Sequence, residues 1–122
     1  FDVIVTTNMF GDILSDLAAE LSGGLGLAAS LNHGENHALA QAQHGSAPDI
    51  AGQDRANPAS LIGSAAMLLE HLGAMSTATR IRYGLDTALA APQTRTRDLG
   101  GPLGTQAFTD TVITAMEHAD TP

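Results

Sequence analysis

The sequence predicts an α/β fold, and three observations support this interpretation. Residues 2–6 (Asp-Val-Ile-Val-Thr) form a run typical of a buried strand, and residues 38–43 have the composition of a second short strand. Most of the remaining chain carries helix signals, with apolar residues at helical spacing or a helix-starting residue before an apolar run. Residues 44–57 are rich in small and rigid residues, which indicates an irregular loop whose backbone can approach a ligand.

The first helix is predicted over residues 9–22. Gly23-Gly24 ends it. Its apolar residues fall on one face at helical spacing: Phe10, Ile13, Leu14, Leu17 and Leu21. The strand at 2–6 cannot be stable alone. We therefore expect either that the chain is cut from a longer one or that partner strands come from elsewhere.

Three further helices are predicted downstream of residues 25–37, which have no regular pattern. Asn57 is expected to cap a helix over 58–72, with Pro58 in its first turn. This helix carries no charge before Glu70, so we expect it to be buried on most sides. A helix over 76–91 ends near Pro92, and residues 93–104 form a loop. Thr105 is expected to cap the last helix, which turns four residues inward: Phe108, Val112, Ile113 and Met116.

Composition limits the kinds of partner and site. The formal charge of −8 argues against nucleic acid and anionic membranes, and it suits metal ions. With no cysteine, disulfides, thiolate metal sites and a cysteine nucleophile are excluded. No signal peptide and no apolar run of transmembrane length stands in the sequence, so a cytoplasmic location is expected.

The glycine pattern does not support a Rossmann dinucleotide motif. Gly23, Gly24 and Gly26 are close together, but Ala29 stands where the last glycine of G-x-G-x-x-G would be. A ligand-binding loop of another kind is indicated by residues 44–57, which contain His44 and Asp49 and lead into a helix.

Two carboxylates lie one turn apart on the first helix. Asp12 and Asp16 share the face opposite the apolar stripe, and their repulsion costs roughly 0.2–0.5 kcal/mol in an isolated helix. A divalent cation would turn this repulsion into binding, and carboxylate-only ligation favours Mg²⁺ or Mn²⁺. Taken alone, the pair is more typical of a solvated acidic face than of a metal site.

Several ordered motifs together resemble one family. They are Thr-Asn-Met-Phe-Gly-Asp-Ile-Leu-Ser-Asp (7–16), Gly-Gly-Leu-Gly-Leu-Ala (23–28), His-Gly-Ser-Ala-Pro-Asp-Ile-Ala-Gly (44–52), Ala-Asn-Pro (56–58) and Asp-Leu-Gly-Gly (98–101). The chain is similar to the C-terminal portion of the β-decarboxylating dehydrogenases, the family of isocitrate and isopropylmalate dehydrogenases.

The resemblance implies an isopropylmalate dehydrogenase-like fold, present only in part. Residues 1–24 would end the smaller, dimer-forming domain that carries the metal-binding helix, and residues 25–122 would form the C-terminal part of the cofactor-binding domain. Asp12 and Asp16 would bind Mg²⁺ or Mn²⁺, together with an aspartate of the partner subunit whose position lies upstream of Phe1. Family members oxidise and decarboxylate a 2-hydroxy acid such as 3-isopropylmalate, isocitrate or tartrate.

The resemblance also assigns the loop to the adenosine half of the cofactor. His44 would lie near the adenine, Asn57 would contact its edge, and the segment between would hold the ribose and phosphates: Gly45, Ser46, Ala47, Pro48, Asp49 and Ile50. Asp49 would accept hydrogen bonds from the ribose hydroxyls and repel the extra phosphate of NADP, so NAD is expected. Members that use NADP carry Lys and Tyr at the positions of Asp49 and Ile50.

No catalytic acid or base can be assigned in these residues, because the family's arginines, tyrosine and lysine lie upstream. Two hypotheses follow. The chain is the C-terminal piece of such an enzyme, which would be a homodimer when complete, or it is a catalytically inert nucleotide- or metal-binding module or a truncated remnant. On the first hypothesis the chain alone is inactive and marginally stable.

Overall fold

A computed structural model describes residues 1–119 of the chain, with Leu25 described by its backbone alone. Its main elements are α1 (Asn8–Leu21), β1 (Ala29–His33), β2 (Ala38–Ala42), α2 (Ala59–His71), α3 (Met75–Ala90) and α4 (Thr105–Glu117). Short 3-10 turns lie in the connections: η1 (Leu25–Leu27), η2 (Pro48–Ile50), η3 (Pro92–Thr94) and η4 (Arg97–Leu99). None of the helices described in residues 1–119 has both the length and the apolar character needed to cross a membrane.

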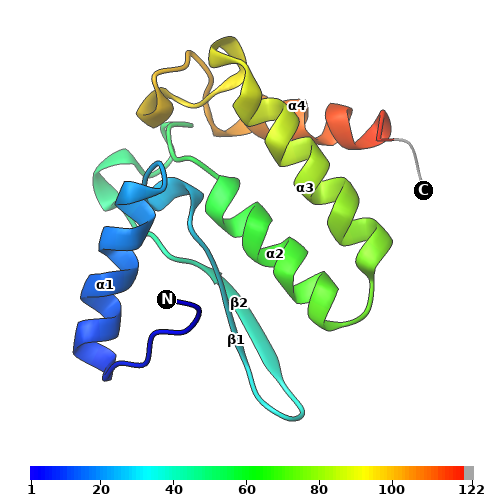
Figure 1. Ribbon diagram of the computed structural model, residues 1–122. Helices are drawn as coiled ribbons and strands as arrows, with labels where there is room; N and C mark the ends of the chain where they lie inside the picture. The colour runs from blue at the N-terminus through cyan, green and yellow to red at the C-terminus, as the bar shows by residue number, and fades with distance from the viewer. Residues whose placement is uncertain (120–122) are drawn as a thin grey trace.

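Helix α2 packs along an antiparallel hairpin of β1 and β2 (Figure 1). Small residues face the strands, and at Gly63 a Cβ atom would come within 3.2 Å of the Ala29 side chain. The Ser64 hydroxyl accepts from the Ser30 amide at 2.9 Å and donates to the Gln41 carbonyl at 2.7 Å, so it joins both strands. This close approach explains why a helix without charge before Glu70 is buried on most sides, as the sequence predicts.

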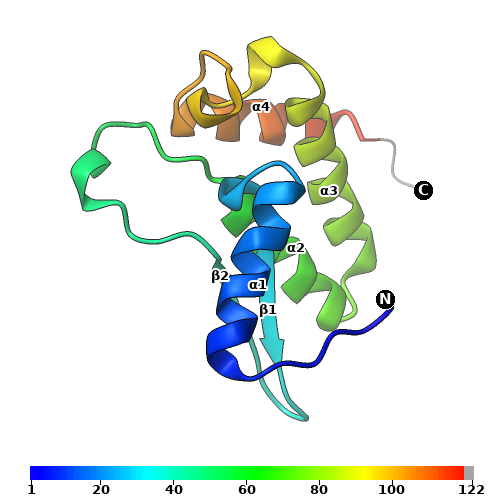
Figure 2. The ribbon, with the colours of Figure 1, turned by 60° about the vertical axis from the view of Figure 1, so that its left-hand side comes forward.

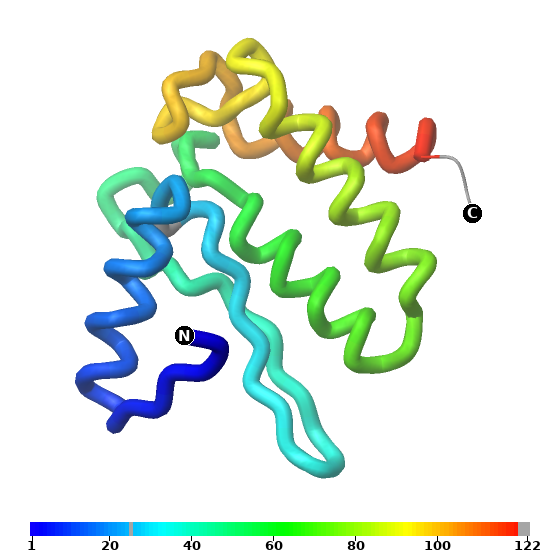
Figure 3. Tube along the Cα trace, in the orientation of Figure 1, coloured from blue at the N-terminus to red at the C-terminus, as the bar shows by residue number. Residues whose placement is uncertain are grey.

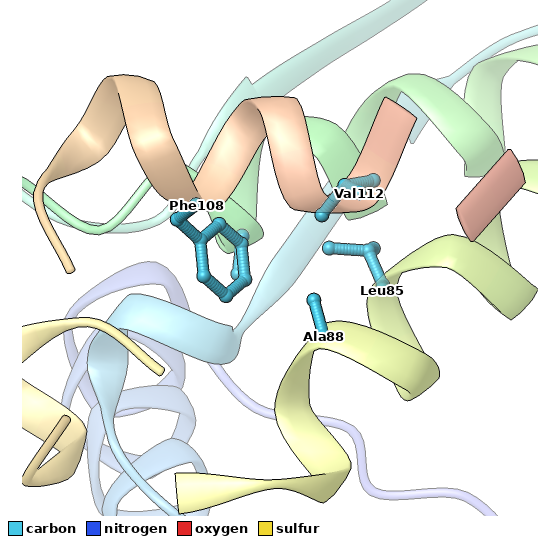
Figure 4. Packing of buried hydrophobic residues seen from close by; sticks show 5 residues of the cluster. Leu85, Ala88, Phe108 and Val112 are labelled. Atoms are coloured by element: carbon cyan, nitrogen blue, oxygen red, sulfur yellow. The ribbon is translucent and has the colours of Figure 1, made fainter. Parts of the chain in front are cut away.

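The main core lies between α3 and α4 (Figure 4). Phe108 is fully buried and packs with Val112 against Leu85 and Ala88. The two helices cross closely at Gly84, where a Cβ atom would lie 2.7 Å from the Val112 carbonyl oxygen. The chain has few aromatic residues, so small residues and close backbone packing replace large rings here.

Helix α1 has its apolar stripe on the surface of the described chain. Phe10, Ile13 and Leu17 are 56%, 58% and 54% exposed, and Ala19 is the helix's buried residue. Residues 1–7 form no strand, which corrects the prediction for 2–6. The physical reason is that no strand within residues 1–119 pairs with them, and an extended segment needs such a partner.

Three further expectations are corrected. Residues 25–37 are not irregular throughout, because β1 lies among them. Thr105 is the first residue of α4 rather than its cap, since Gly104 occupies that position. Ile113 is 49% exposed and does not face the core, because it follows Val112 around the helix and α3 covers only one face. The predicted helices otherwise agree with α1, α2, α3 and α4 within about two residues.

Candidate functional site

The segment between β2 and α2 is a wide loop that leaves the body of the molecule and returns (Figure 2). Pro48 and Asp49 begin the short turn η2, and Ala47 before them has a left-handed backbone with φ 41° and ψ 59°. A left-handed conformation costs an alanine roughly 1–2 kcal/mol. Such local strain is concentrated at ligand-binding loops, where the surrounding structure enforces it.

Asp54 ties the far side of this loop to α4. Its Oδ1 accepts a hydrogen bond from the Gln106 amide at 2.8 Å, and its carbonyl oxygen accepts one from the Thr105 amide at 3.3 Å. The Thr105 hydroxyl donates to the Ala56 carbonyl at 2.5 Å. Gly104 makes room for this contact, because a Cβ atom there would overlap the Asp54 carboxylate. The loop thus supplies the side-chain cap that α4 lacks in its own sequence.

Asn57 joins the end of the loop to segment 92–104, which lies beside the start of α2 (Figure 3). Its side chain is buried, its Oδ1 accepts from the Ala59 amide at 2.9 Å, and its Nδ2 donates to Asp98 Oδ2 at 2.9 Å. The predicted cap is corrected by one residue, because Pro58 occupies the cap position and α2 begins at Ala59, but the Asn57 side chain still accepts from the first helical amide.

Two adjoining pockets open along the loop. The large loop pocket has a volume of about 440 Å³, and these residues line it: Gly26, His44, Gly45, Ala47, Ile50, Arg55, Ala56, Asn57 and Asp98. The small loop pocket, of about 180 Å³, shares several of these residues and reaches Ser46, Gly52, Asp54 and Thr105. Apolar side chains from Ala47, Ile50 and Ala56 stand beside polar groups from Asn57 and Asp98, and such a mixed lining is typical of small-molecule sites.

Most of the predicted cofactor residues come together at these pockets. His44, Gly45, Ala47, Ile50 and Asn57 line the large loop pocket, and Ser46 lines the small one. Pro48 and Asp49 line neither. Asp49 is exposed on η2, and its carbonyl oxygen accepts from Gln53 Nε2 at 2.8 Å.

The sequence interpretation missed three polar residues of this region: Asp54, Arg55 and Asp98. Arg55 is the one arginine or lysine that lines either loop pocket in the described chain. Arg95, in the segment after α3, lines neither loop pocket, and its Nε donates to the Leu89 carbonyl at 2.7 Å. A polar residue next to the motif was the available signal for Asp54 and Arg55, but Asp98 is 41 positions from Asn57 and only the fold joins them.

Asp12 and Asp16 are exposed on α1, away from the loop pockets. Among residues 1–119, no group of three or more His, Cys, Asp or Glu side chains is placed to hold one metal ion. A further pocket of about 400 Å³ lies between the end of α1 and Gln43, and Ser15 rather than either aspartate lines it. The hard oxygen donors of the pair suit Mg²⁺ or Mn²⁺, but full ligation needs groups beyond these two residues.

One ion pair lies outside the site. Arg82 Nε donates to Glu70 Oε1 at 2.6 Å and joins α2 to α3. The hydrogen bond from Arg82 holds the pKa of Glu70 below its ordinary value and outweighs the opposing effect of desolvation. His33 is the last residue of β1 and His71 the last residue of α2, and their ring centroids are 5.2 Å apart.

Comparison with known proteins gives a consistent result. A sequence profile described as isocitrate/isopropylmalate dehydrogenase matches residues 1–113. The chain is 55% identical over 117 residues to an isocitrate/homoisocitrate dehydrogenase of Thermus thermophilus, which covers 96% of this chain and 35% of that protein. It is 60% identical over 81 residues to an NADP isocitrate dehydrogenase of Rickettsia bellii, covering 66% of this chain and 17% of that one.

A solved structure is similar over nearly the whole chain. The isocitrate dehydrogenase of Methylococcus capsulatus superposes with a TM-score of 0.88 at 46% identity, covering 92% of this chain and 34% of that one. This likeness confirms the expected fold, an α/β fold of this type present in part. The chain spans about a third of the length of the first relative described above.

Proposed function

Because the chain belongs to the isocitrate/isopropylmalate dehydrogenase family, we propose that it is the C-terminal part of an NAD- and Mg²⁺- or Mn²⁺-dependent oxidative decarboxylase. The substrate would be a 2-hydroxy acid such as isocitrate, 3-isopropylmalate or tartrate. The observation that carries the proposal is the large loop pocket. Five of the residues assigned to the cofactor line it, and so does Asp98, which accepts a hydrogen bond from one of them, Asn57.

The loop residues would bind and orient the adenosine half of NAD. The aliphatic walls of the large loop pocket would cover the faces of the adenine ring, and Gly45 would let the backbone approach the ribose and phosphates. Asp49 is exposed on η2, so its carboxylate oxygens would accept hydrogen bonds from the ribose hydroxyls. The nicotinamide end, where hydride transfer takes place, would extend beyond these residues.

Asp49 is the basis for preferring NAD over NADP. The family relationship does not decide this question, because one of the relatives named above is an NADP enzyme. A carboxylate beside the adenosine ribose repels a 2′-phosphate, and an exposed pair of this kind changes affinity by up to about fivefold after solvent screening. The proposal therefore predicts that removing this charge weakens the preference for NAD.

Asp12 and Asp16 would hold Mg²⁺ or Mn²⁺ together with ligands from the substrate and from outside the described residues. Bound there, the metal would polarise the substrate's oxygen atoms and stabilise the negative charge that forms on decarboxylation. We propose further that residues 1–24 belong to a smaller domain that forms a homodimer, and that 25–122 belong to the cofactor domain. The exposed apolar stripe of α1 supports a partner for this helix.

The alternative, a catalytically inert nucleotide- or metal-binding module, makes a different prediction. A chimera can separate the two: this chain replaces the corresponding C-terminal third of the Thermus thermophilus enzyme named above. We expect the chimera to reduce NAD with isocitrate and Mn²⁺, and Asp49→Asn to lower its preference for NAD over NADP by up to about fivefold.

The matched control is Glu35→Gln, which removes an exposed negative charge in the turn between β1 and β2, outside both pocket linings. A folded chimera that binds NAD but turns over no 2-hydroxy acid would favour the inert module. Unchanged preference in Asp49→Asn, or an equal change in Glu35→Gln, would contradict the role given to Asp49.

A further inference from the structure

We propose that His33 and His71 form a two-histidine site for a divalent transition metal ion, with Zn²⁺ as the best fit. His33 is the last residue of β1 and His71 the last residue of α2, so only the fold joins them. Neither residue lines a loop pocket, and the inference therefore stands apart from the proposed cofactor site. It also differs from the Mg²⁺ or Mn²⁺ role of the α1 aspartates, because imidazole nitrogen suits Zn²⁺, Cu²⁺ and Ni²⁺ whereas Mg²⁺ prefers oxygen.

The spacing of the two rings fits a tetrahedral ion. Their centroids are 5.2 Å apart, and their planes are tilted by 39°. Two imidazoles that ligate one Zn²⁺ at about 2.0–2.1 Å, with a tetrahedral angle at the metal, have centroids about 5.2 Å apart. The right angle of an octahedral ion would bring the centroids to about 4.5 Å at the same bond length. Because both side chains are exposed, rotation about their side-chain bonds can turn one nitrogen of each ring toward a shared ion.

The ring nitrogens of this pair are available to a metal ion. Within residues 1–119, His44 is the histidine whose ring has a hydrogen-bond partner, and the ion pair joins Arg82 to Glu70 rather than any histidine to a carboxylate. The formal charge of −8 raises the concentration of cations near the surface. In the part of the chain that the structure describes, no third His, Cys, Asp or Glu is placed to join the two histidines. Water would therefore fill the two remaining positions of the tetrahedron.

A bound ion would fasten the turn end of the hairpin to α2. The turn after His33 is closed by a hydrogen bond from the Gly34 amide to the His37 carbonyl at 2.9 Å, and the ion would add a link from this end to the helix. Two protein ligands supply roughly half the binding free energy of a four-ligand zinc site, so we expect a Kd on the order of 1–100 μM. With free Zn²⁺ at about ten times the Kd, states in which the hairpin has left α2 should become about tenfold rarer.

The test is calorimetric titration of the full chain, without an affinity tag, with ZnCl₂ in excess MgCl₂. The Mg²⁺ occupies sites made of oxygen ligands alone. We expect one Zn²⁺ site, and His33→Gln and His71→Gln should each weaken it at least tenfold, because the loss of either ligand removes the chelation. The matched control is His118→Gln, which removes an exposed histidine just beyond the end of α4 and should leave the affinity unchanged.

Hydrogen exchange at the Ser30 amide, which donates to Ser64 Oγ on α2, gives a second readout. Zn²⁺ at about ten times the Kd should slow this exchange about tenfold in the unaltered chain but not in His33→Gln. The same titrations in the chimera described above, compared with its His33→Gln variant, keep the test decisive when the isolated chain does not fold. Zn²⁺ binding that is undiminished in both glutamine variants, or no binding below millimolar Zn²⁺ in either protein, would overturn the inference. A chimera that fails to use NAD would count against the proposed function and leave this site standing.

Discussion

The contact between Asp54 and α4 gives a prediction whose size can be worked out from the structure. Asp54 has φ 53°, and its Oδ1 accepts from the Gln106 amide at 2.8 Å. Loss of such a helix cap costs about 1 kcal/mol, and a left-handed alanine costs roughly 1–2 kcal/mol more than a residue that tolerates this conformation. Asp54→Ala should therefore destabilise the junction by about 2 kcal/mol.

Two companion variants separate the causes. Asp54→Gly loses the cap but suits the left-handed backbone, so we expect a loss of about 1 kcal/mol or less. Asp54→Asn keeps an acceptor and tolerates the conformation, and loses only the favourable charge at the start of α4, worth roughly 0.3–1 kcal/mol.

The assay is hydrogen exchange at the Gln106 amide, measured beside urea unfolding of the whole chain. Asp54→Ala should lower the protection of that amide by up to about 30-fold. Equal effects for the alanine and glycine variants would refute the backbone argument, and unchanged protection in both would show that Asp54 does not hold the loop to α4.

Three further outcomes follow. Phe108→Ala should destabilise the chain by about 3–5 kcal/mol in urea unfolding. Ile113→Ala, on the exposed side of α4, should change stability by no more than about 0.5 kcal/mol. Equal losses would contradict the core described above. Asp12→Asn should raise the helicity of α1 by removing a like charge, worth roughly 0.2–0.5 kcal/mol, and should abolish any increase in helicity caused by MnCl₂; a larger Mn²⁺ response in the variant would count against the metal role. The pKa of Glu70 is lower in the folded chain than in the unfolded one. Its pair with Arg82 therefore stabilises the fold above the unfolded glutamate pKa, and this contribution is lost as pH falls through the folded pKa. Arg82→Gln should flatten that part of the acid unfolding profile, and a profile identical to that of the unaltered chain would be inconsistent with the pair.

Local sequence signals were sufficient where the chain folds on itself. The stretch without charge before Glu70 predicted a mostly buried α2, and Asn57 before Pro58 predicted the helix start, because capping and burial depend on neighbouring residues. The spacing of Phe108, Val112 and Met116 likewise predicted the face of α4 that meets α3.

Expectations failed where structure depends on distant partners. Residues 2–6 have strand composition but no strand within residues 1–119 to pair with them. Segment 29–33 lacks β-branched residues and becomes β1 only because β2 and Ser64 of α2 satisfy its backbone. Asp98 follows α3 in the chain and is 41 positions from Asn57, so no spacing in the sequence indicates their contact.

We propose that the loop between β2 and α2 binds the adenosine half of NAD. Nuclear Overhauser contacts between the adenine protons of bound NAD and the chain test this binding mode. We predict contacts from adenine H2 and H8 to the methyl groups of Ile50 and Ala56, which line the large loop pocket. Bound NAD with adenine contacts only to residues outside that pocket, for example along α1, would contradict the account.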